Sequence, residues 1–209
     1  MISISYSILT HNETDSLLQL LNYLVNNKDD QDEIVILDDF SDDKKTIEIL
    51  DAMVSMNNIV FEQRHLKGDF ASQKNYLRQM CSKDYIFNID ADELPHKLLA
   101  KNLKTIIEFN KEIELFYVPR INTVEGITDR HFMKWGWNKN DKGHINWPDW
   151  QPRLHKNVSH IFWNRAVHER LDGFKTYTTL PEEERFALVH HKTIDRQEKQ
   201  NQFYSTLFK

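Results

Sequence analysis

Three acidic side chains follow a short apolar segment, and their spacing is the first indication of chemistry in this chain. The segment Tyr85–Ile89 is rich in β-formers, and Asp90, Asp92 and Glu93 come directly after it. In an extended chain the side chains of residues i and i+2 point the same way, so we expect Asp90 and Asp92 to reach one point. Two hard oxygen ligands at a strand end suit Mg²⁺ or Mn²⁺ carrying a diphosphate. The alternative is an acidic loop that caps the next helix.

Two other polar clusters follow apolar segments earlier in the chain. Residues 10–13 read Thr-His-Asn-Glu, and residues 38–41 read Asp-Asp-Phe-Ser. Taken alone, Asp38 and Asp39 are equally suited to begin a turn, and Ser41 to cap the helix after it. A functional interpretation depends on whether these clusters meet the acids at 90–93.

The elements that must position these clusters alternate between strands and helices. Apolar runs predict strands at four places: 2–9, 34–37, 58–61 and 85–89. Helical spacing of apolar residues predicts four helices: 13–25, 43–56, 70–81 and 97–109. This alternation predicts an α/β fold with a mostly parallel central sheet flanked by helices. Ligands of such sheets bind beyond the carboxyl ends of the strands, so we expect the three clusters to share one crevice.

The carboxyl half differs from the amino half in its amino-acid composition. After a predicted strand at 114–120, residues 121–175 contain all five tryptophans. Aromatic faces pack well on pyranose rings, although large aromatics are more often core residues, and we single out Trp150 as an acceptor-side wall. The tail becomes regular again, with a strand at 186–190 and a helix at 195–208. With no repeat or linker, we predict one domain, 1–209, with a nucleotide-binding half at 1–110 and an aromatic-rich acceptor and catalytic half at 111–209.

Composition and glycine content exclude several classes of function. The 209 residues suffice for one large domain, and the net charge of −5 gives no general attraction to nucleic acid or anionic membrane. With Cys81 as the only cysteine, no basic leader and no apolar run long enough to span a bilayer, we expect a cytoplasmic protein without a transmembrane segment. The five glycines match neither G-x-G-x-x-G nor G-x-x-x-x-G-K-[ST]. A bound phosphate would therefore need a metal ion and basic side chains.

In order along the chain, these motifs resemble a family-2 glycosyltransferase of the GT-A fold. The resemblance is carried by T-x-N-E at 10–13, D-D-x-S-x-D at 38–43 and D-A-D at 90–92, with Lys74-Asn75 similar to that family's [RK]-N pair. The carboxyl half resembles the lipopolysaccharide-core β-glucosyltransferase branch through three cues: Gln151–Leu154, Val167–Glu169 and His190–His191. The chain is shorter than usual for that family and lacks its membrane-associating tail, so the resemblance leaves the acceptor open.

The resemblance implies that the amino half binds the nucleoside of a UDP-sugar. Thr10 and Asp39 would hydrogen-bond the uracil edge, since a carboxylate accepts from a ring N–H that cytosine lacks. Asn12 and Glu13 would lie near the same nucleoside. Asp90 would sit by the ribose.

It also implies a diphosphate site with Mn²⁺ or Mg²⁺. Asp92 would ligate the metal, with Asp90 beside it and His190 or His191 as a further ligand, because adjacent residues of a strand cannot both face one site. Lys74 and Arg153 would face the diphosphate. From the residues alone, Lys74 is equally suited to a solvated helix face, and Arg153 to pairing with a nearby acid.

The transfer implied by the resemblance is inverting and needs a general base in the carboxyl half. Glu169 is the first choice and Asp149 the second, and His168 would lie on the acceptor side with Trp150. The expected reaction moves a sugar from a nucleotide-sugar to a hydroxyl on a glycan or similar molecule. Three alternatives remain: a hydroxylated DNA base as acceptor, which the acidic charge disfavours; a non-catalytic nucleotide- or glycan-binding protein; and a nucleotidyltransferase, whose glycine-rich loop is missing here.

Overall fold

A computed structural model describes residues 2–207. Strands and helices alternate in the amino half: β1 (Ile4–Thr10), α1 (Asp15–Asn27), β2 (Glu33–Asp38), α2 (Lys44–Asn57), β3 (Val60–Gln63), α3 (Phe70–Met80), β4 (Tyr85–Asn88), β5 (Glu93–Pro95) and α4 (Lys97–Glu108). The carboxyl half follows: β6 (Leu115–Val118), β7 (Arg120–Glu125), α5 (Asp129–Trp135), β8 (Gln151–Lys156), β9 (Phe162–Asn164), β10 (Arg170–Asp172), β11 (Tyr177–Thr179), the 3-10 turn η1 (Glu184–Phe186), β12 (Leu188–Thr193) and α6 (Ile194–Leu207).

The described chain forms a central sheet of seven strands in the order β11-β6-β8-β4-β1-β2-β3. β1 runs parallel to β2 and β4, and β2 runs parallel to β3, whereas β8 is antiparallel to β4 and β6. The register pairs Thr10 with Asp38, so β1 and β2 end together at one edge of the sheet. The predicted α/β fold with a mostly parallel central sheet is confirmed.

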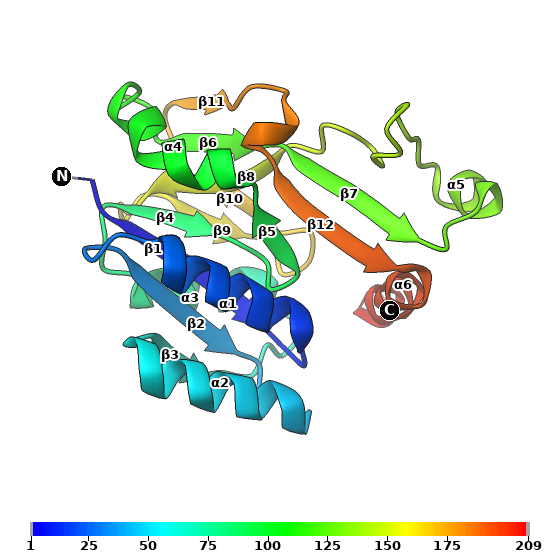
Figure 1. Ribbon diagram of the computed structural model, residues 1–209, viewed down its shortest axis with the longest axis horizontal. Helices are drawn as coiled ribbons and strands as arrows, with labels where there is room; N and C mark the ends of the chain where they lie inside the picture. Colours follow the sequence, from blue (N-terminus) through cyan, green and yellow to red (C-terminus); the bar gives the residue numbers. More distant parts are fainter. Residues whose placement is uncertain (1, 208–209) are drawn as a thin grey trace.

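Alternating side chains of the buried strands fill two cores, one on each face of the sheet. On β2, Ile34 and Ile36 pack with apolar residues of α1, α2 and α4, while Val35 and Leu37 pack with Leu77 of α3. This is the period-2 pattern of a strand covered on both faces. Figure 1 shows α1 and α4 in front of the sheet and α3 behind it. The two layers hold the strand ends rigidly in place.

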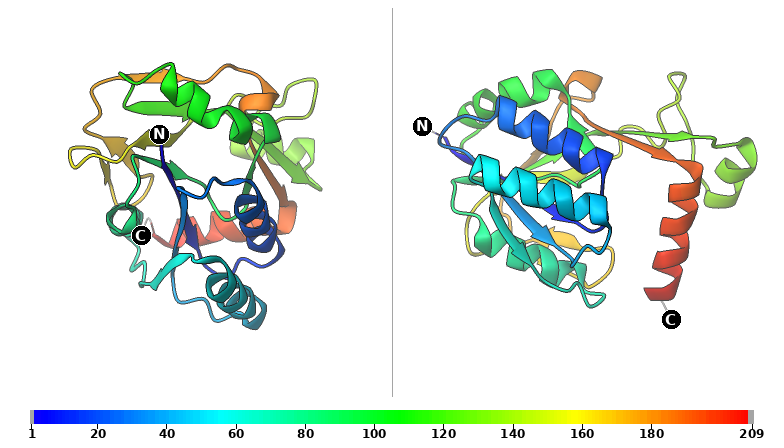
Figure 2. Two further views of the ribbon diagram at one scale, coloured as in Figure 1. Left: turned by 60° about the vertical axis from the view of Figure 1, so that its left-hand side comes forward. Right: turned by 60° about the horizontal axis from the view of Figure 1, so that its bottom comes forward.

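A second sheet of three strands in the described chain, ordered β5-β12-β7, carries the carboxyl half of the cleft. β12 is parallel to β7 and antiparallel to β5, which brings His190 opposite both Asn122 and Glu93. β7 and β12 extend away from the central sheet toward α5 and α6 (Figure 1). Seen from below, α6 runs beside the open edge where β1 and β2 end (Figure 2).

The predicted elements of the amino half are present, with ends within two residues of the expected bounds. Three local predictions were wrong. The strand expected at 114–120 divides into β6 and β7, because Pro119 lies between them and has no N–H to donate. The strand expected at 186–190 begins later, after η1. The chain does not stay extended through 90–92, because residues 91–92 form a turn in which Glu93 N donates to Asp90 O at 2.9 Å.

The predicted last helix is present as α6, although Phe208 lies outside the described residues. Between residues 2 and 207 we find no helix with the length and apolarity needed to cross a bilayer. The predicted division into halves at residue 110 stays a prediction.

Candidate active site

A cleft of about 860 Å³ opens beyond the carboxyl ends of β1, β2 and β4. Its opposite wall comes from β7, β12 and α6. Ten of the residues singled out from the sequence line it: Thr10, Asn12, Glu13, Asp39, Lys74, Asp90, Asp92, Asp149, Glu169 and His190. Three others, Arg153, Trp150 and His168, are not among the described lining residues. The crevice expected from three separate strand ends is therefore present.

The adjacent acids at the end of β2 have different environments. Asp38 is fully buried and accepts hydrogen bonds from Ser41 N at 2.9 Å, Ser41 Oγ at 2.6 Å and Gln63 Nε2 at 2.9 Å. Asp39 lines the cleft, and its Oδ1 accepts from Leu66 N at 2.8 Å. The turn interpretation thus suits Asp38, and Asp39 is the acid that faces the cleft.

The end of β1 presents one polar group without a partner. Thr10 is buried in the cleft wall, and its Oγ1 has no hydrogen bond within the described chain. Asn12 differs, because its Nδ2 donates to Asp42 at 2.8 Å and its Oδ1 accepts from Asp42 N and Asp43 N at 3.0 and 2.9 Å. Asn12 therefore fixes the loop after β2 with its whole amide, while Thr10 keeps a hydroxyl available to a ligand.

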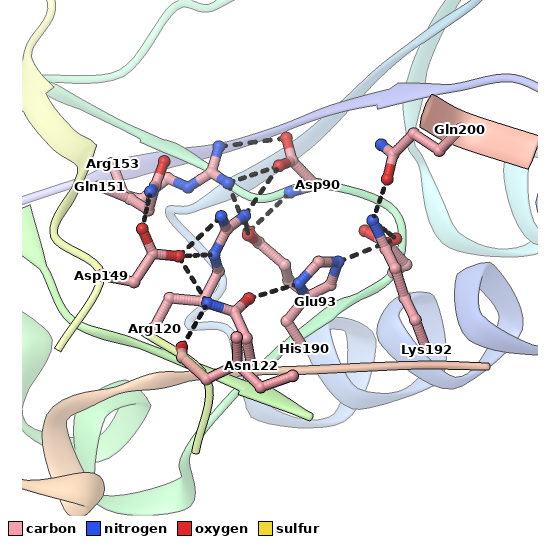
Figure 3. A network of polar contacts seen from close by, with 12 residues as sticks. Asp90, Glu93, Arg120, Asn122, Asp149, Gln151, Arg153, His190, Lys192 and Gln200 are labelled. Atoms are coloured by element: carbon pink, nitrogen blue, oxygen red, sulfur yellow. Dashed lines mark hydrogen bonds and ion pairs between the residues drawn. The ribbon is translucent and has the colours of Figure 1, made fainter. Parts of the chain in front are cut away.

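A buried ionic network separates Asp90 from the position expected of a metal ligand (Figure 3). Arg153 donates to both oxygens of Asp90, one of them at 3.1 Å, and also to Glu93 at 2.5 Å. Burial alone would raise the pKa of Asp90, but the charge and hydrogen bonds of Arg153, with the charges of Lys74 and Arg120, together hold that pKa well below its usual range. Arg153 thus pairs with Asp90 and with the buried Glu93 and does not itself line the cleft, in line with the pairing alternative.

Asp149, the second choice for the general base, belongs to the same network. It accepts from Arg120 Nε at 2.8 Å, Asn122 Nδ2 at 2.6 Å and Gln151 Nε2 at 2.8 Å. Burial raises the pKa of Asp149, but the charge of Arg120 together with the three hydrogen bonds lowers it by more, so the net pKa is below the ordinary value. A carboxylate with this many donors is a poor proton acceptor. Its contacts suit a positioning group for Arg120 and Asn122.

Asp92 and His190 form a pair, and Asn122 fixes the proton on Nδ1 of the histidine. The Asn122 amide donates from Nδ2 to Asp149, so its Oδ1 must accept from His190 Nδ1 at 2.7 Å. His190 Nε2 then points to Asp92 Oδ2 at 3.1 Å. Burial raises the pKa of Asp92, but the hydrogen bond from His190 and nearby positive charges hold it well below its usual range. His191 lies on the other face of β12 with Thr123 at 2.8 Å, so His190 is the histidine in the cleft.

The residues present fit a divalent ion that shares its ligands with a diphosphate. Across residues 2–207 no three His, Cys, Asp or Glu side chains are grouped to hold a metal by themselves. Mg²⁺, however, is commonly bound through one or two carboxylates together with substrate phosphates. With Nδ1 donating to Asn122, His190 turns Nε2 toward Asp92, and an ion bound beside Asp92 would take the place of the Nε2 proton. Asp90 is not part of this set.

The predicted base and the predicted diphosphate lysine contact each other. Lys74 Nζ lies 2.5 Å from Glu169 Oε1, and both side chains are largely buried. Lys74 Nζ also lies 4.4 Å from the centroid of the Trp163 ring, a cation–π contact. Glu169 therefore reaches the cleft from the loop before β10, and the positive charge of Lys74 on α3 offsets its negative charge.

Among the polar residues that line the cleft and that sequence reasoning missed are Arg120, Asn122, Lys192 and Arg196. Lys192 Nζ lies 3.6 Å and Arg196 Nη2 lies 3.0 Å from Asp92 Oδ2. Both lie near His190 in the sequence, and Lys192 shares its face of β12, which is the signal that could have identified it. Trp137 lines the cleft where Trp150 was expected.

Comparison with known proteins identifies the family. Residues 5–172 match the family described as Glycosyl transferase family 2. The chain belongs to this family. As a family-2 member it is 29% identical over 116 residues to the SPbeta prophage-derived glycosyltransferase SunS of Bacillus subtilis (strain 168), and equally to SunS of Bacillus phage SPbeta. The match covers 56% of this chain and 25% of either relative.

Solved structures give the same fold for this family-2 chain. S. aureus TarS matches with a TM-score of 0.60 at 12% identity, over 95% of this chain and 38% of TarS. TarS 1–349 in complex with UDP-GlcNAc matches with a TM-score of 0.56 at 14% identity, over 92% of this chain and 58% of that one. At such identities the likeness shows the fold alone. The predicted GT-A architecture is confirmed.

Proposed function

We propose that this protein transfers a sugar from a UDP-sugar to an acceptor hydroxyl, with inversion and with the help of Mn²⁺ or Mg²⁺. The observation that carries the proposal is the meeting of Thr10, Asp39, Asp92 and His190 in one cleft. Membership of family 2 supports glycosyl transfer as the reaction. The structures of TarS with UDP and with UDP-GlcNAc, on a similar fold, support a uridine nucleotide as the donor.

Thr10 and Asp39 would recognise the uracil ring. The unpaired Thr10 hydroxyl can donate to a ring carbonyl, and the free oxygen of Asp39 can accept from the ring N–H. Leaving a buried hydroxyl unpaired costs about 1–3 kcal/mol, which a ligand with a carbonyl would recover.

Asp92 and His190 would hold the divalent ion, and Lys192 and Lys74 would add positive charge near the diphosphate. When bound, the ion would act as a Lewis acid that neutralises charge on the departing diphosphate. Asn122 keeps the His190 ring oriented for this role through its 2.7 Å hydrogen bond to Nδ1. Asp149 holds Asn122 in turn, and Arg120 holds Asp149.

Glu169 would accept the proton of the acceptor hydroxyl as that oxygen attacks the sugar. A carboxylate in this role contributes about 10²–10⁴-fold. Attack from the face opposite the diphosphate displaces it in one step and inverts the anomeric carbon. In the free protein Lys74 Nζ lies 2.5 Å from the Glu169 carboxylate, which must take the proton. Lys74 would therefore have to leave Glu169 and bind the diphosphate instead.

We also propose a glycan acceptor, as the resemblance of Gln151–Leu154 and Val167–Glu169 to the lipopolysaccharide-core branch implies. The half-buried Trp137 in the cleft wall supports it, since an indole face packs well on a sugar ring. Incubating the protein with UDP-sugars and separate glycan and hydroxymethylated-DNA acceptors would test it. Transfer to DNA alone would overturn the glycan assignment.

Thermal unfolding with nucleotides tests the donor. UDP with Mn²⁺ at 100-fold over Kd should stabilise the protein by about 2.7 kcal/mol, with a smaller effect from UDP alone. CDP and GDP serve as matched nucleotides, because neither offers the uracil N–H between two carbonyls. Equal stabilisation by all three would remove Thr10 and Asp39 from base recognition, and no stabilisation by any would overturn the donor assignment.

A further inference from the structure

The guanidinium of Arg196 lies where the cleft would receive a divalent ion. Arg196 comes from the first turn of α6, and its Nη2 contacts Asp92 Oδ2 at 3.0 Å. That oxygen is also the one that His190 Nε2 faces at 3.1 Å. An ion held by Asp92 and His190 would need the space beside this oxygen. The guanidinium and the ion therefore compete for one position.

Arg196 also joins two acids that come from different loops. The same Nη2 contacts Glu13, which follows β1, as well as Asp92, which follows β4. Burial raises the pKa of Glu13, the charge of Arg196 lowers it and Asp92 raises it again, with a net increase. The two carboxylates repel each other, and a cation between them offsets that repulsion. In the free protein Arg196 supplies this cation.

α6 is tied to the amino half of the cleft through this side chain. The helix packs mainly against β12 and β7 in the carboxyl half. Figure 2 shows α6 beside the edge where β1 and β2 end, with the helix axis away from the central sheet. Arg196 reaches across to Glu13 and Asp92. A change of partner at Arg196 would therefore change how α6 is held against the amino half of the cleft.

We infer that Arg196 substitutes for the divalent ion in the free protein and moves from Asp92 to the diphosphate when the donor and its ion bind. Arginine suits both partners, since its planar donors match carboxylate and phosphate oxygens alike. The exchange keeps the acids compensated at every stage and brings α6 onto the bound nucleotide. This inference rests on the proposed function for its second half, whereas the competition with the ion stands on the geometry alone.

Arg196→Gln tests the inference because it should change two affinities in opposite directions. Without the guanidinium, Mn²⁺ alone should bind Asp92 more tightly than in the wild type, by about tenfold. With saturating Mn²⁺, UDP should bind about tenfold more weakly, because the diphosphate loses a charged donor. The first affinity is measured from the electron paramagnetic resonance signal of free Mn²⁺, and the second by calorimetry.

Lys199→Gln is the matched control. It removes one positive charge from the same helix at a position that lines the cleft without an ion pair to Asp92 or Glu13 in the described structure. It should leave Mn²⁺ affinity unchanged and alter UDP affinity much less than Arg196→Gln. Should Arg196→Gln fold poorly, Arg196→Met gives the same test, because it also removes the positive charge and keeps an unbranched side chain of similar reach.

The outcomes separate this inference from the proposed function. Unchanged or weaker Mn²⁺ binding in Arg196→Gln would overturn the competition, and equal losses for Mn²⁺ and UDP would mark a purely structural residue. UDP binding that Arg196→Gln leaves intact would overturn the partner exchange. If the wild type binds Mn²⁺ but no UDP, the proposed function fails while the Mn²⁺ comparison still decides the first half.

Discussion

The two walls of the cleft differ in how their polar groups are satisfied. The wall built by the ends of β1 and β2 has a rigid frame, with Asp38 and Asn12 fully bonded, and it leaves Thr10 and one side of Asp39 open. The chemical wall, where Asp92 after β4 and Glu169 before β10 meet β12 and α6, has its reactive groups already paired, Asp92 with Arg196 and Glu169 with Lys74. The recognition side is thus ready for a ligand, whereas the chemical side must exchange partners first.

Glu169→Gln should give the largest effect and would break the comparison if it did not. The amide cannot accept the acceptor's proton, so turnover should fall by about 10²–10⁴-fold, while UDP binding on the other wall stays intact. A radiolabelled-sugar transfer assay and calorimetry measure the two. Glu183→Gln, a surface change outside the cleft, is the control. Near-normal turnover in Glu169→Gln would remove Glu169 from the base role.

Arg153→Met should give the largest loss of stability. The change leaves the fully buried Glu93 carboxylate, and Asp90 at the cleft, with one fewer partner each, and breaking a buried ion pair costs about 3–5 kcal/mol. Urea unfolding measures the loss, with Arg185→Met on the surface as a control expected within about 0.5 kcal/mol. Equal stability of the two variants would show that this network does not hold the walls together.

The buried side chain of His155, on β8 of the central sheet, predicts that the protein loses stability as the pH falls. Burial lowers the pKa of His155 to about 4, so the unfolded chain takes up a proton at higher pH than the folded one. The contribution of neutral His155 to the free energy of unfolding is fully present above about pH 6.5. It is lost as the pH falls toward 4, and it amounts to a few kcal/mol at most. Urea unfolding between pH 4 and 7 measures it. His155→Gln should flatten this dependence, and an unchanged slope would contradict the assignment.

Thr10→Val should give the smallest effect and sharpens the comparison most. Because the buried Thr10 hydroxyl has no partner in the described chain, its removal should raise stability, by about 1 kcal/mol at the lower end of the cost of an unpaired hydroxyl. The free energy of UDP binding should become less favourable by the contribution of one hydrogen bond, about 0.5–1.5 kcal/mol. Thr178→Val, far from the cleft, is the control. A large loss of stability without loss of affinity would make Thr10 a structural residue.

The sequence predicted the recognition wall better than the chemical wall, for a physical reason. Thr10 and Asp39 follow local apolar runs, and parallel strands bring such ends together. Asp90 could not be assigned in this way, because its direction is set by Arg153, which lies 63 residues away. Arg196 was missed for the same reason, since it meets Asp92 across 104 residues. Long-range ion pairs leave no periodic trace in the sequence.

Other predictions were resolved by packing that sequence alone does not specify. The choice between His190 and His191 depended on which face of the β5-β12-β7 sheet lines the cleft. Trp150 was favoured for its neighbours in sequence, yet Trp137 from the segment after α5 reaches the cleft wall. Periodicity gives the two faces of a strand but not which one a ligand will meet.

The position of β12 as the middle strand of its sheet has a consequence for how the protein tolerates change. Buried and exposed side chains alternate along Leu188–Thr193, so deleting one residue from the loop before it would turn the whole strand over. His190 and Lys192 would then leave the cleft together, and His191 would enter it. Insertions and deletions in this part of the gene should therefore be tolerated in pairs far more readily than singly.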